Sequence, residues 1–263
     1  MKQVIYTITE NTPLTADVYR MALAGDTSAL TTPGQFINIA LDGLFLRRPI
    51  SVCDWDESGL TIIYKVVGRG TAQMSEMKPG AALDCLSGLG NGYDVAACPD
   101  GALLVGGGVG APPLYGLAKR LIAAGKRPSV ILGFNTASEI FYDMKFAALG
   151  APVTVTTVDG TAGTRGFITD AMPAGRRRPP SEAADTRDGF ARPLTGQTPY
   201  VCACGPEPML KAVYQRASGG QFSFEARMGC GFGACMGCSC QTIAGPKRIC
   251  KEGPVLRFEE IIW

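Results

Sequence analysis

The first hundred residues consist of short apolar or alternating runs separated by turn residues. The runs occupy residues 4–8, 36–41, 50–55, 60–67 and 81–86. Pro-Gly pairs at 33–34 and 79–80 punctuate them. Short strands at this spacing predict an antiparallel β-barrel or a sandwich, which we assign to residues 1–98. The pattern alone is also compatible with a plain β domain that binds no ligand.

The middle of the chain, residues 99–217, instead alternates strands with helices. Buried strands are predicted at residues 102–105, 129–134, 153–158 and 200–203, and the first helix from about 112 to 124. This alternation predicts a parallel α/β sheet with right-handed crossovers. Residues 174–197 carry three consecutive arginines, two prolines and few apolar positions, so we interpret them as a mobile surface insertion. Contact of these arginines with a phosphate is an alternative reading.

Charge and hydropathy limit the classes of partner. The formal net charge is +2 and 46% of the residues are hydrophobic. This charge is too small to indicate nucleic-acid binding. The sequence has no basic-then-apolar leader and no apolar run of about 18 residues, the length that a membrane helix needs. We therefore expect a cytoplasmic protein that contacts neither nucleic acid nor membrane.

The residue counts indicate where the chemistry lies. The chain has ten Cys and no His. Catalysis by Ser–His or Cys–His pairs and metal ligation by His are therefore excluded. In a cytosolic chain, clustered cysteines favour metal binding over disulfides. Most of the clustered cysteines fall in residues 218–263, which we expect to form a compact third module.

The cysteines of this module have the spacing C-x4-C-x2-C-x11-C. The first three match the plant-type 2Fe–2S arrangement, which a more distant cysteine completes. Interleaved glycines allow the backbone to approach the cluster closely. A four-cysteine zinc site is the alternative, but zinc sites usually pair two short hooks, and here a single cysteine follows one hook. The expected ligands are Cys230, Cys235, Cys238 and Cys250.

The remaining cysteines have other expected roles. Cys240 is a nearby spare that is an alternative to Cys238 or Cys250 as a ligand. Four further cysteines are expected to be small core residues. These are Cys53, Cys85, Cys98 and Cys202.

Two turns in the α/β segment predict a dinucleotide site. A glycine-rich turn follows a buried strand and precedes a helix, so the helix N-terminus can bind a pyrophosphate. A simple structural turn is the alternative. The second turn, at residues 204–209, is expected beside the first, with Cys204 near the nicotinamide. Residues 134–139 contain no basic side chain, which favours NAD over NADP. The expected contacts are Gly106, Gly107, Gly108, Gly110, Cys204 and Gly205.

A flavin is expected between these two sites. A nicotinamide transfers two electrons as a hydride, whereas a 2Fe–2S cluster transfers one at a time. Flavin is the usual carrier that does both. The segment Arg47-Arg48-Pro49-Ile50-Ser51 is the candidate motif, because Arg suits a pyrophosphate and a Ser hydroxyl suits the polar edge of the flavin.

The ordered set of motifs resembles the ferredoxin–NADP reductase superfamily, and within it the electron-transfer subunits of class 1B dihydroorotate dehydrogenases. The resemblance covers nearly the whole chain except residues 174–197. It implies FAD on the barrel, NAD(H) on the α/β domain and the cluster in the third module. The superfamily often has a Tyr where this chain has Ile50, which leaves the flavin-stacking residue unassigned. The FAD contacts implied are Arg48, Pro49, Ile50, Ser51, Ile63, Tyr64, Lys65, Gly70 and Thr71.

The resemblance also implies a partner and an electron path. A separate FMN-containing catalytic subunit oxidises dihydroorotate, in a heterotetramer with two copies of each subunit. Electrons then pass through the cluster to FAD and on to NAD+, within pyrimidine biosynthesis. One alternative is the reductase subunit of another complex, such as a ferredoxin–NADP oxidoreductase or a sulfide dehydrogenase, but these typically have Asp at the first cluster position, where this chain has Cys230. The other is a zinc-stabilised nucleotide-binding regulatory protein without redox turnover.

Overall fold

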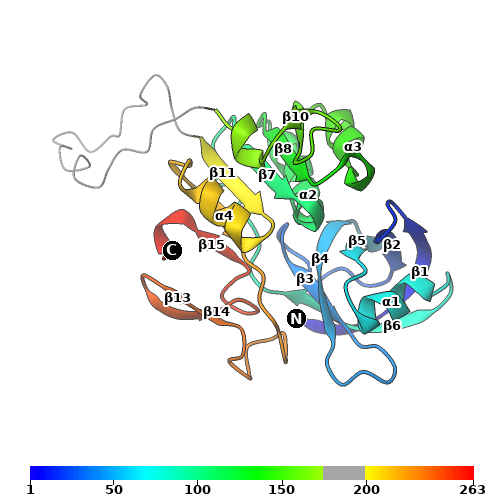
Figure 1. Cartoon of the computed structure of the whole chain (residues 1–263). Coiled ribbons are helices and arrows are strands. Elements are labelled where there is room, and N and C mark those ends of the chain that lie inside the picture. The colour runs from blue at the N-terminus through cyan, green and yellow to red at the C-terminus, as the bar shows by residue number, and fades with distance from the viewer. Residues whose placement is uncertain (174–198) are drawn as a thin grey trace.

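The first part of the chain forms a closed antiparallel barrel of six strands in the computed structural model, which describes residues 1–173 and 199–263 (Figure 1). The strand order is β1-β2-β5-β4-β3-β6. Closure confirms the barrel and excludes the sandwich. The short helix α1 (Arg69–Glu76) follows β5. The strands are β1 (Lys2–Pro13), β2 (Val18–Ala24), β3 (Phe36–Ile39), β4 (Arg48–Trp55), β5 (Gly59–Lys65) and β6 (Ala82–Leu89).

The second part is a seven-stranded sheet in the order β10-β9-β8-β7-β11-β12-β15. Its neighbouring strands are parallel except β15, which runs antiparallel to β12. The strands are β7 (Leu103–Gly107), β8 (Ser129–Phe134), β9 (Val153–Thr157), β10 (Thr164–Arg165), β11 (Tyr200–Cys204), β12 (Gly219–Ser223) and β15 (Val255–Arg257). The α-helices are α2 (Ala111–Ala123), α3 (Asp143–Ala148) and α4 (Glu207–Tyr214). The short 3-10 turns are η1 (Gly108–Gly110), η2 (Ala137–Glu139), η3 (Ile168–Ala171) and η5 (Phe258–Glu260).

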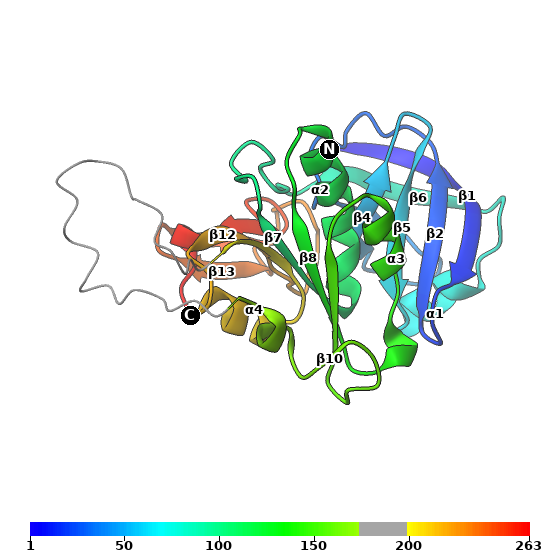
Figure 2. The same ribbon diagram turned by 90° about the horizontal axis from the view of Figure 1, so that it is seen from above.

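The cysteine-rich segment lies between two strands of this sheet. The chain leaves the sheet after β12, passes through the cysteine loop and the hairpin β13 (Ser239–Thr242) and β14 (Gly245–Arg248), and returns as β15. Two strands from residues 218–263 therefore complete the α/β sheet. Figure 2 shows β12 and β13 on the side of the sheet away from the barrel strands β1 and β2. The expected insertion at 174–197 falls outside the described residues.

The barrel and the sheet meet where α2 packs against β4. A Cβ atom at Gly116 would lie 2.6 Å from the Cys53 carbonyl oxygen, so glycine permits this close approach. The Arg120 guanidinium carbon lies 3.5 Å from the centroid of the Trp55 ring. This packing fixes the two sheets around the crevice between them. Among the described residues, no helix has both the length and the apolar character needed to cross a bilayer.

Candidate functional site

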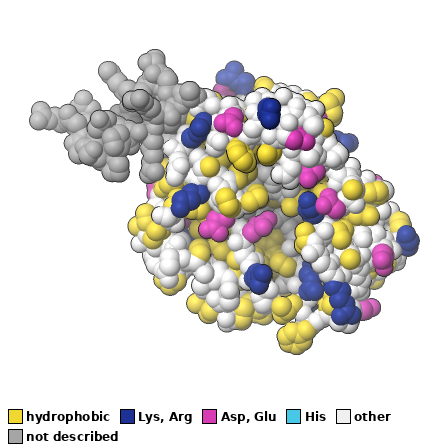
Figure 3. Space-filling view, in the orientation of Figure 1, with side chains coloured by type: hydrophobic (Ala, Val, Ile, Leu, Met, Phe, Trp, Pro, Cys, Tyr) yellow, Lys and Arg dark blue, Asp and Glu magenta, His cyan; other side chains and the backbone are white. Residues whose placement is uncertain are grey.

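A cavity of about 650 Å³ lies at the carboxyl ends of the parallel strands. Its walls come from the turns that follow β7, β8, β9 and β11. This is the edge at which open α/β sheets bind nucleotides, and the volume falls in the range of small-molecule sites. The space-filling view shows hydrophobic side chains gathered in a recess near the middle of this face (Figure 3).

The predicted glycines serve two different purposes. A Cβ atom added at Gly106 would lie 2.9 Å from the Ala111 Cα. One added at Gly110 would lie 2.2 Å from the Cys204 carbonyl oxygen. These two glycines therefore permit tight packing of the turn against the strand. Gly107 and Gly108 line the cavity, as does Gly110. At Gly108 the φ angle is +52° and nothing lies within 4 Å of an added Cβ. The open glycine surface before α2 suits a pyrophosphate.

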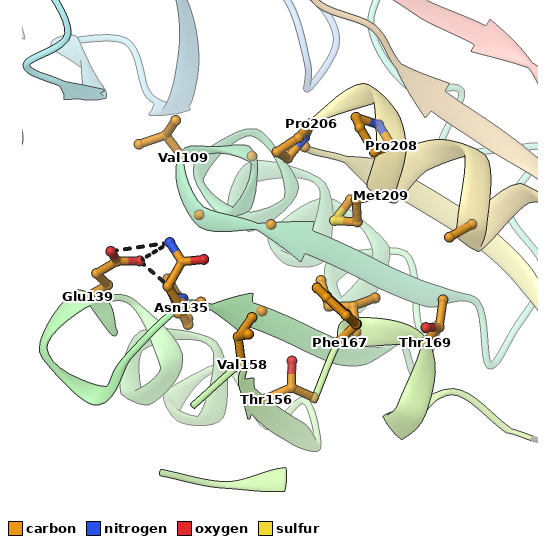
Figure 4. A pocket seen from close by; sticks show the side chains of 18 of the residues that line it. Val109, Asn135, Glu139, Thr156, Val158, Phe167, Thr169, Pro206, Pro208 and Met209 are labelled. Carbon is orange, nitrogen blue, oxygen red and sulfur yellow. Dashed lines mark hydrogen bonds between the residues drawn. The ribbon is translucent and has the colours of Figure 1, made fainter. Parts of the chain in front are cut away.

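The far wall of the cavity comes from residues to which the sequence analysis assigned no dinucleotide contact. Glu139 accepts hydrogen bonds from the Asn135 backbone N–H at 3.1 Å and from its side-chain Nδ2 at 2.9 Å (Figure 4). Phe167, in the loop after β10, and Met209, in α4, line the same cavity. The lining residues between β8 and α3 include no Lys or Arg.

The second predicted turn contributes differently from the expectation. Gly205 lines the cavity, whereas Cys204 is buried in the core beneath it and is not on its wall. The reason is the alternation along β11, which turns Cys202 and Cys204 to the same buried side. Burial, with a smaller effect of the Glu225 charge, raises the pKa of the Cys204 thiol to about 12.

Glu225 is a further acidic residue that sequence reasoning missed. Its side chain lines the large cavity and also a second cavity of about 390 Å³, which Cys238 and Trp263 help to line. Burial raises the pKa of the Glu225 carboxyl above its usual value. Glu225 therefore places one titratable group on the wall of the dinucleotide cavity and of the cavity that Cys238 lines.

The flavin candidates lie on β4, β5 and α1. The four residues from Arg48 to Ser51 are half-buried on β4. Lys65 lines the cavity, and its Nζ lies 3.0 Å from Asp17 Oδ2. Ile63 is buried in the core cluster shared with α2. The Tyr64 side chain is in the barrel core, where its hydroxyl donates to Asn11 Oδ1 at 3.0 Å, so Tyr64 offers only backbone atoms to a ligand.

Arg48 and the first turn of α1 form one small site. A Cβ atom at Gly70 would lie 2.3 Å from Arg48 Nε, so the absence of a side chain at Gly70 lets the Arg48 side chain lie against this turn. Thr71 Oγ1 accepts hydrogen bonds from the Val67 and Gly68 N–H groups and orders the turn. A guanidinium beside the N–H groups of a helix N-terminus is suited to a pyrophosphate.

The four predicted ligand cysteines form two pairs. In the first, the N–H groups of Ala234 and Cys235 donate to Cys230 Sγ at 3.2 and 3.4 Å. In the second, the Cys250 N–H donates to Cys238 Sγ at 3.4 Å. Among the described residues, no three Cys, His, Asp or Glu side chains converge as ligands of a single ion. Two thiol pairs match a cluster in which two irons share two sulfides and each needs two thiolates.

Electrostatics differ between the pairs. Partial burial raises the pKa of the Cys230 thiol, but backbone N–H groups outweigh this effect and lower the pKa to about 6. Burial, followed by the neighbouring Cys238 and Cys230 sulfurs, raises the pKa of Cys250 to about 12. A Cβ atom added at Gly233 would lie 2.6 Å from the Lys251 side chain, so the loop of the first pair lies beside the segment that carries Cys250. Cys240 is half-buried on β13, outside both pairs.

The cysteines assigned to the core are buried, as predicted. Cys98 and Cys202 lie with their sulfurs 3.5 Å apart in the α/β core. Burial raises the pKa of Cys85 to about 12. Cys53 lies in the seam between β4 and α2. These thiols serve packing.

Comparison with known proteins decides the family. A model described as the iron-sulfur cluster binding domain of dihydroorotate dehydrogenase B matches residues 225–262, which include all four paired cysteines. The dihydroorotate dehydrogenase B (NAD(+)) electron transfer subunit of Geobacillus sp. (strain WCH70) is 38% identical over 275 aligned residues, covering 100% of this chain and 99% of the relative. The subunit of the same name from Bacillus mycoides (strain KBAB4) is 40% identical, covering 94% and 93%. The chain belongs to this family of electron transfer subunits.

Solved structures confirm the fold of this electron transfer subunit family member. A structure of NADH-dependent reduced ferredoxin-NADP oxidoreductase matches with a TM-score of 0.81 and 29% identity, over 98% of this chain and 90% of that one. A ferredoxin NADP+ reductase from Neisseria gonorrhoeae with bound FAD and NADP matches with a TM-score of 0.63 and 18% identity, over 82% and 91%. The predicted ferredoxin–NADP reductase architecture is therefore correct.

Proposed function

We propose that this chain is the NAD+-reducing electron transfer subunit of a dihydroorotate dehydrogenase. The observation that supports this most directly is the shared wall of the two cavities, because Glu225 lines both the dinucleotide cavity and the second cavity, which Cys238 of the second thiol pair also lines. A one-electron site and a two-electron site thus occur in one chain. The partner oxidises dihydroorotate to orotate, releasing two electrons and two protons. NAD+ takes up both electrons and one proton to give NADH.

The cysteine loop fits a 2Fe–2S cluster. Cys230 with Cys235 would hold one iron, and Cys238 with Cys250 the other. The backbone N–H groups directed at Cys230 stabilise its thiolate, the form that ligates metal. The small residues of the loop permit this wrapping, since Gly231 and Gly233 have φ angles of +78° and +95°. We assign the cluster to the module at 218–263.

The barrel at residues 1–98 fits FAD. When bound, flavin exchanges either one or two electrons, which links a hydride carrier to a one-electron cluster. The proposed contacts are those of the sequence analysis, with Arg48 and the first turn of α1 binding the pyrophosphate. Gly70 permits that arrangement. Lys65, at the end of β5, lines the dinucleotide cavity itself.

The α/β domain, assigned to residues 99–217 with β12 and β15 added, fits NAD(H). Gly107 and Gly108 would receive the pyrophosphate before α2, and Gly205 lies on the wall of the same cavity. The lack of basic residues after β8 supports NAD over NADP. Glu139 adds a negative charge that would repel a 2′-phosphate.

The partner in this proposal is a separate FMN-containing catalytic subunit. A heterotetramer with two copies of each subunit would operate in the cytoplasm. The exposed Phe232 and Met236 lie in the cysteine loop, where a docked partner would bring its own redox group close to the cluster. The proposal includes neither nucleic acid nor membrane as a partner.

A second candidate function follows from the structural match at a TM-score of 0.81. It makes this chain the small reductase subunit of an NADH-dependent ferredoxin–NADP oxidoreductase or a related sulfide dehydrogenase. The presence of Cys at position 230 favours the first proposal.

The test is reconstitution. The chain is co-expressed with a candidate catalytic subunit, purified anaerobically as a complex, and assayed for dihydroorotate-driven formation of NADH at 340 nm. The matched control carries Cys235→Ser and should lose NADH formation, while the catalytic subunit still reduces an artificial dye with dihydroorotate. If the intact complex contains flavin and iron but forms no NADH from dihydroorotate, and instead reduces ferredoxin with NAD(P)H, the second candidate is correct.

A further inference from the structure

Asn38 is a buried polar residue on the outer face of the barrel. It lies on β3 with 1% of its surface exposed. Its neighbours Ile37 and Ile39 point into the barrel core. Since side chains alternate along a strand, Asn38 faces the other way. Phe36 shares that face and packs in the same cluster as Cys238 and Cys250.

The Asn38 side chain contacts the backbone of the first cysteine. Its Nδ2 donates a hydrogen bond to the Cys230 carbonyl oxygen at 3.2 Å. This is a direct side-chain hydrogen bond from the barrel strand β3 to the cysteine loop. The next residue is Gly231, where an added Cβ would lie 2.3 Å from Asn38 Nδ2. The loop is thus shaped to receive this amide.

The other side of Asn38 is attached to the proposed flavin strand. Asn38 pairs with Pro49 on β4, in the middle of the Arg48–Ser51 segment. Arg47 donates to the Asn38 carbonyl oxygen at 3.3 Å, and its guanidinium also binds Asp84. The backbone of Asn38 is therefore fixed on the barrel side while its side chain fixes Cys230.

The Asn38 amide has one further polar atom. Its Oδ1 is buried and accepts no hydrogen bond from the described residues. A buried acceptor without a donor lowers stability, and an apolar side chain of similar shape would avoid this cost. The amide is thus poorly explained as a packing residue. Its donor group, by contrast, has a partner in the Cys230 carbonyl oxygen.

We propose that Asn38 is the positioning residue that holds the Cys230 end of the cluster loop at a fixed place relative to the flavin barrel. The proposal rests on the proposed function, because it takes the cluster to be held by the four paired cysteines. Polar groups around metal ligands orient those ligands, and their loss typically costs about 10- to 100-fold in metal affinity or activity.

The experiment uses the holoprotein with Asn38→Leu, which keeps the branched shape but removes the donor. The control is Asn91→Ala, because Asn91 Nδ2 also donates to a backbone carbonyl of the cysteine segment, that of Glu252, at 3.2 Å. Anaerobic release of iron to a chelator is followed by the loss of visible absorbance. The paramagnetic resonance spectrum of the dithionite-reduced cluster is recorded alongside.

We expect Asn38→Leu to release iron about 10-fold faster than wild type and to shift the g values of the reduced cluster, with Asn91→Ala unchanged. Wild-type release and g values in Asn38→Leu would overturn the proposal. If Asn38→Leu does not fold, Gly231→Ala displaces the amide from the other side. Gly245→Ala, with a φ of +100° and nothing within 4 Å, controls for backbone strain alone. Wild-type protein without iron would refute the proposed function instead.

Discussion

Gly70→Ala should weaken FAD binding without unfolding the barrel. The added methyl would lie 2.3 Å from Arg48 Nε and must displace this half-buried side chain, since the turn of α1 is fixed by Thr71. Hydrogen bonds to charged groups contribute about 1.5–3 kcal/mol, which corresponds to about 10- to 150-fold in Kd for FAD. Stability itself should hold or rise, because Ala is favoured over Gly in a helix by about 1 kcal/mol.

The assay is titration of deflavinated protein with FAD, followed by quenching of flavin fluorescence, with thermal unfolding measured in parallel. Gly68→Ala is the matched control, because an added Cβ there meets nothing within 4 Å. Arg48→Ala should lose as much affinity as Gly70→Ala. The double variant should lose no more than Arg48→Ala alone, because both changes remove the same contact. Equal FAD affinity in Gly70→Ala and Gly68→Ala would refute the reasoning.

Three further outcomes are expected. Cys235→Ser should abolish bound iron while Cys240→Ser retains it, as measured by iron analysis of anaerobically purified protein; retention of iron by Cys235→Ser would contradict the ligand assignment. Gly110→Ala should lower the unfolding temperature, since its Cβ would lie 2.2 Å from the Cys204 carbonyl oxygen and overpacking costs about 1–3 kcal/mol; an unchanged melting curve would exclude this packing. Burial raises the pKa of Glu225, so the folded state binds more protons than the unfolded state. The free energy of unfolding of the wild type therefore falls as pH rises from the usual Glu pKa through the raised value. Glu225→Gln should remove that fall in urea titrations across this pH range, and an identical slope in both proteins would contradict it.

The local parts of the structure were predictable because the information is local in sequence. The turn at 106–110 and the cysteine spacing each occupy a few residues, and the structure places both at strand or loop positions that match the prediction. Strand β2 was missed because its buried residues do not share one face. Val18 packs toward α2, whereas Met21 and Leu23 point into the barrel, so the run lacks simple alternation.

The walls of the large cavity could not be predicted in the same way. The lining residues come from separate elements, and only the strand order brings them together; they include Glu139 in η2, Phe167 and Glu225 in loops, and Met209 in α4. Burial also changed two expectations. The Tyr64 ring belongs to the barrel core and Cys204 lies beneath the cavity, because the pleat of each strand decides which side a residue faces, and a sequence run buried on both faces does not reveal that choice.

The return of the chain at β15 also determines how far the cysteine module can travel. The two ends of the module form adjacent strands of one sheet, β12 and β15, in which Phe222 pairs with Leu256. A domain attached by a single linker can move between an electron donor and an acceptor. The cysteine module is attached at both ends, so it cannot move in this way unless the pairing of β12 with β15 is broken. Electron transfer in such a molecule depends on a fixed distance between its redox sites, and the partner has to dock at the cysteine module.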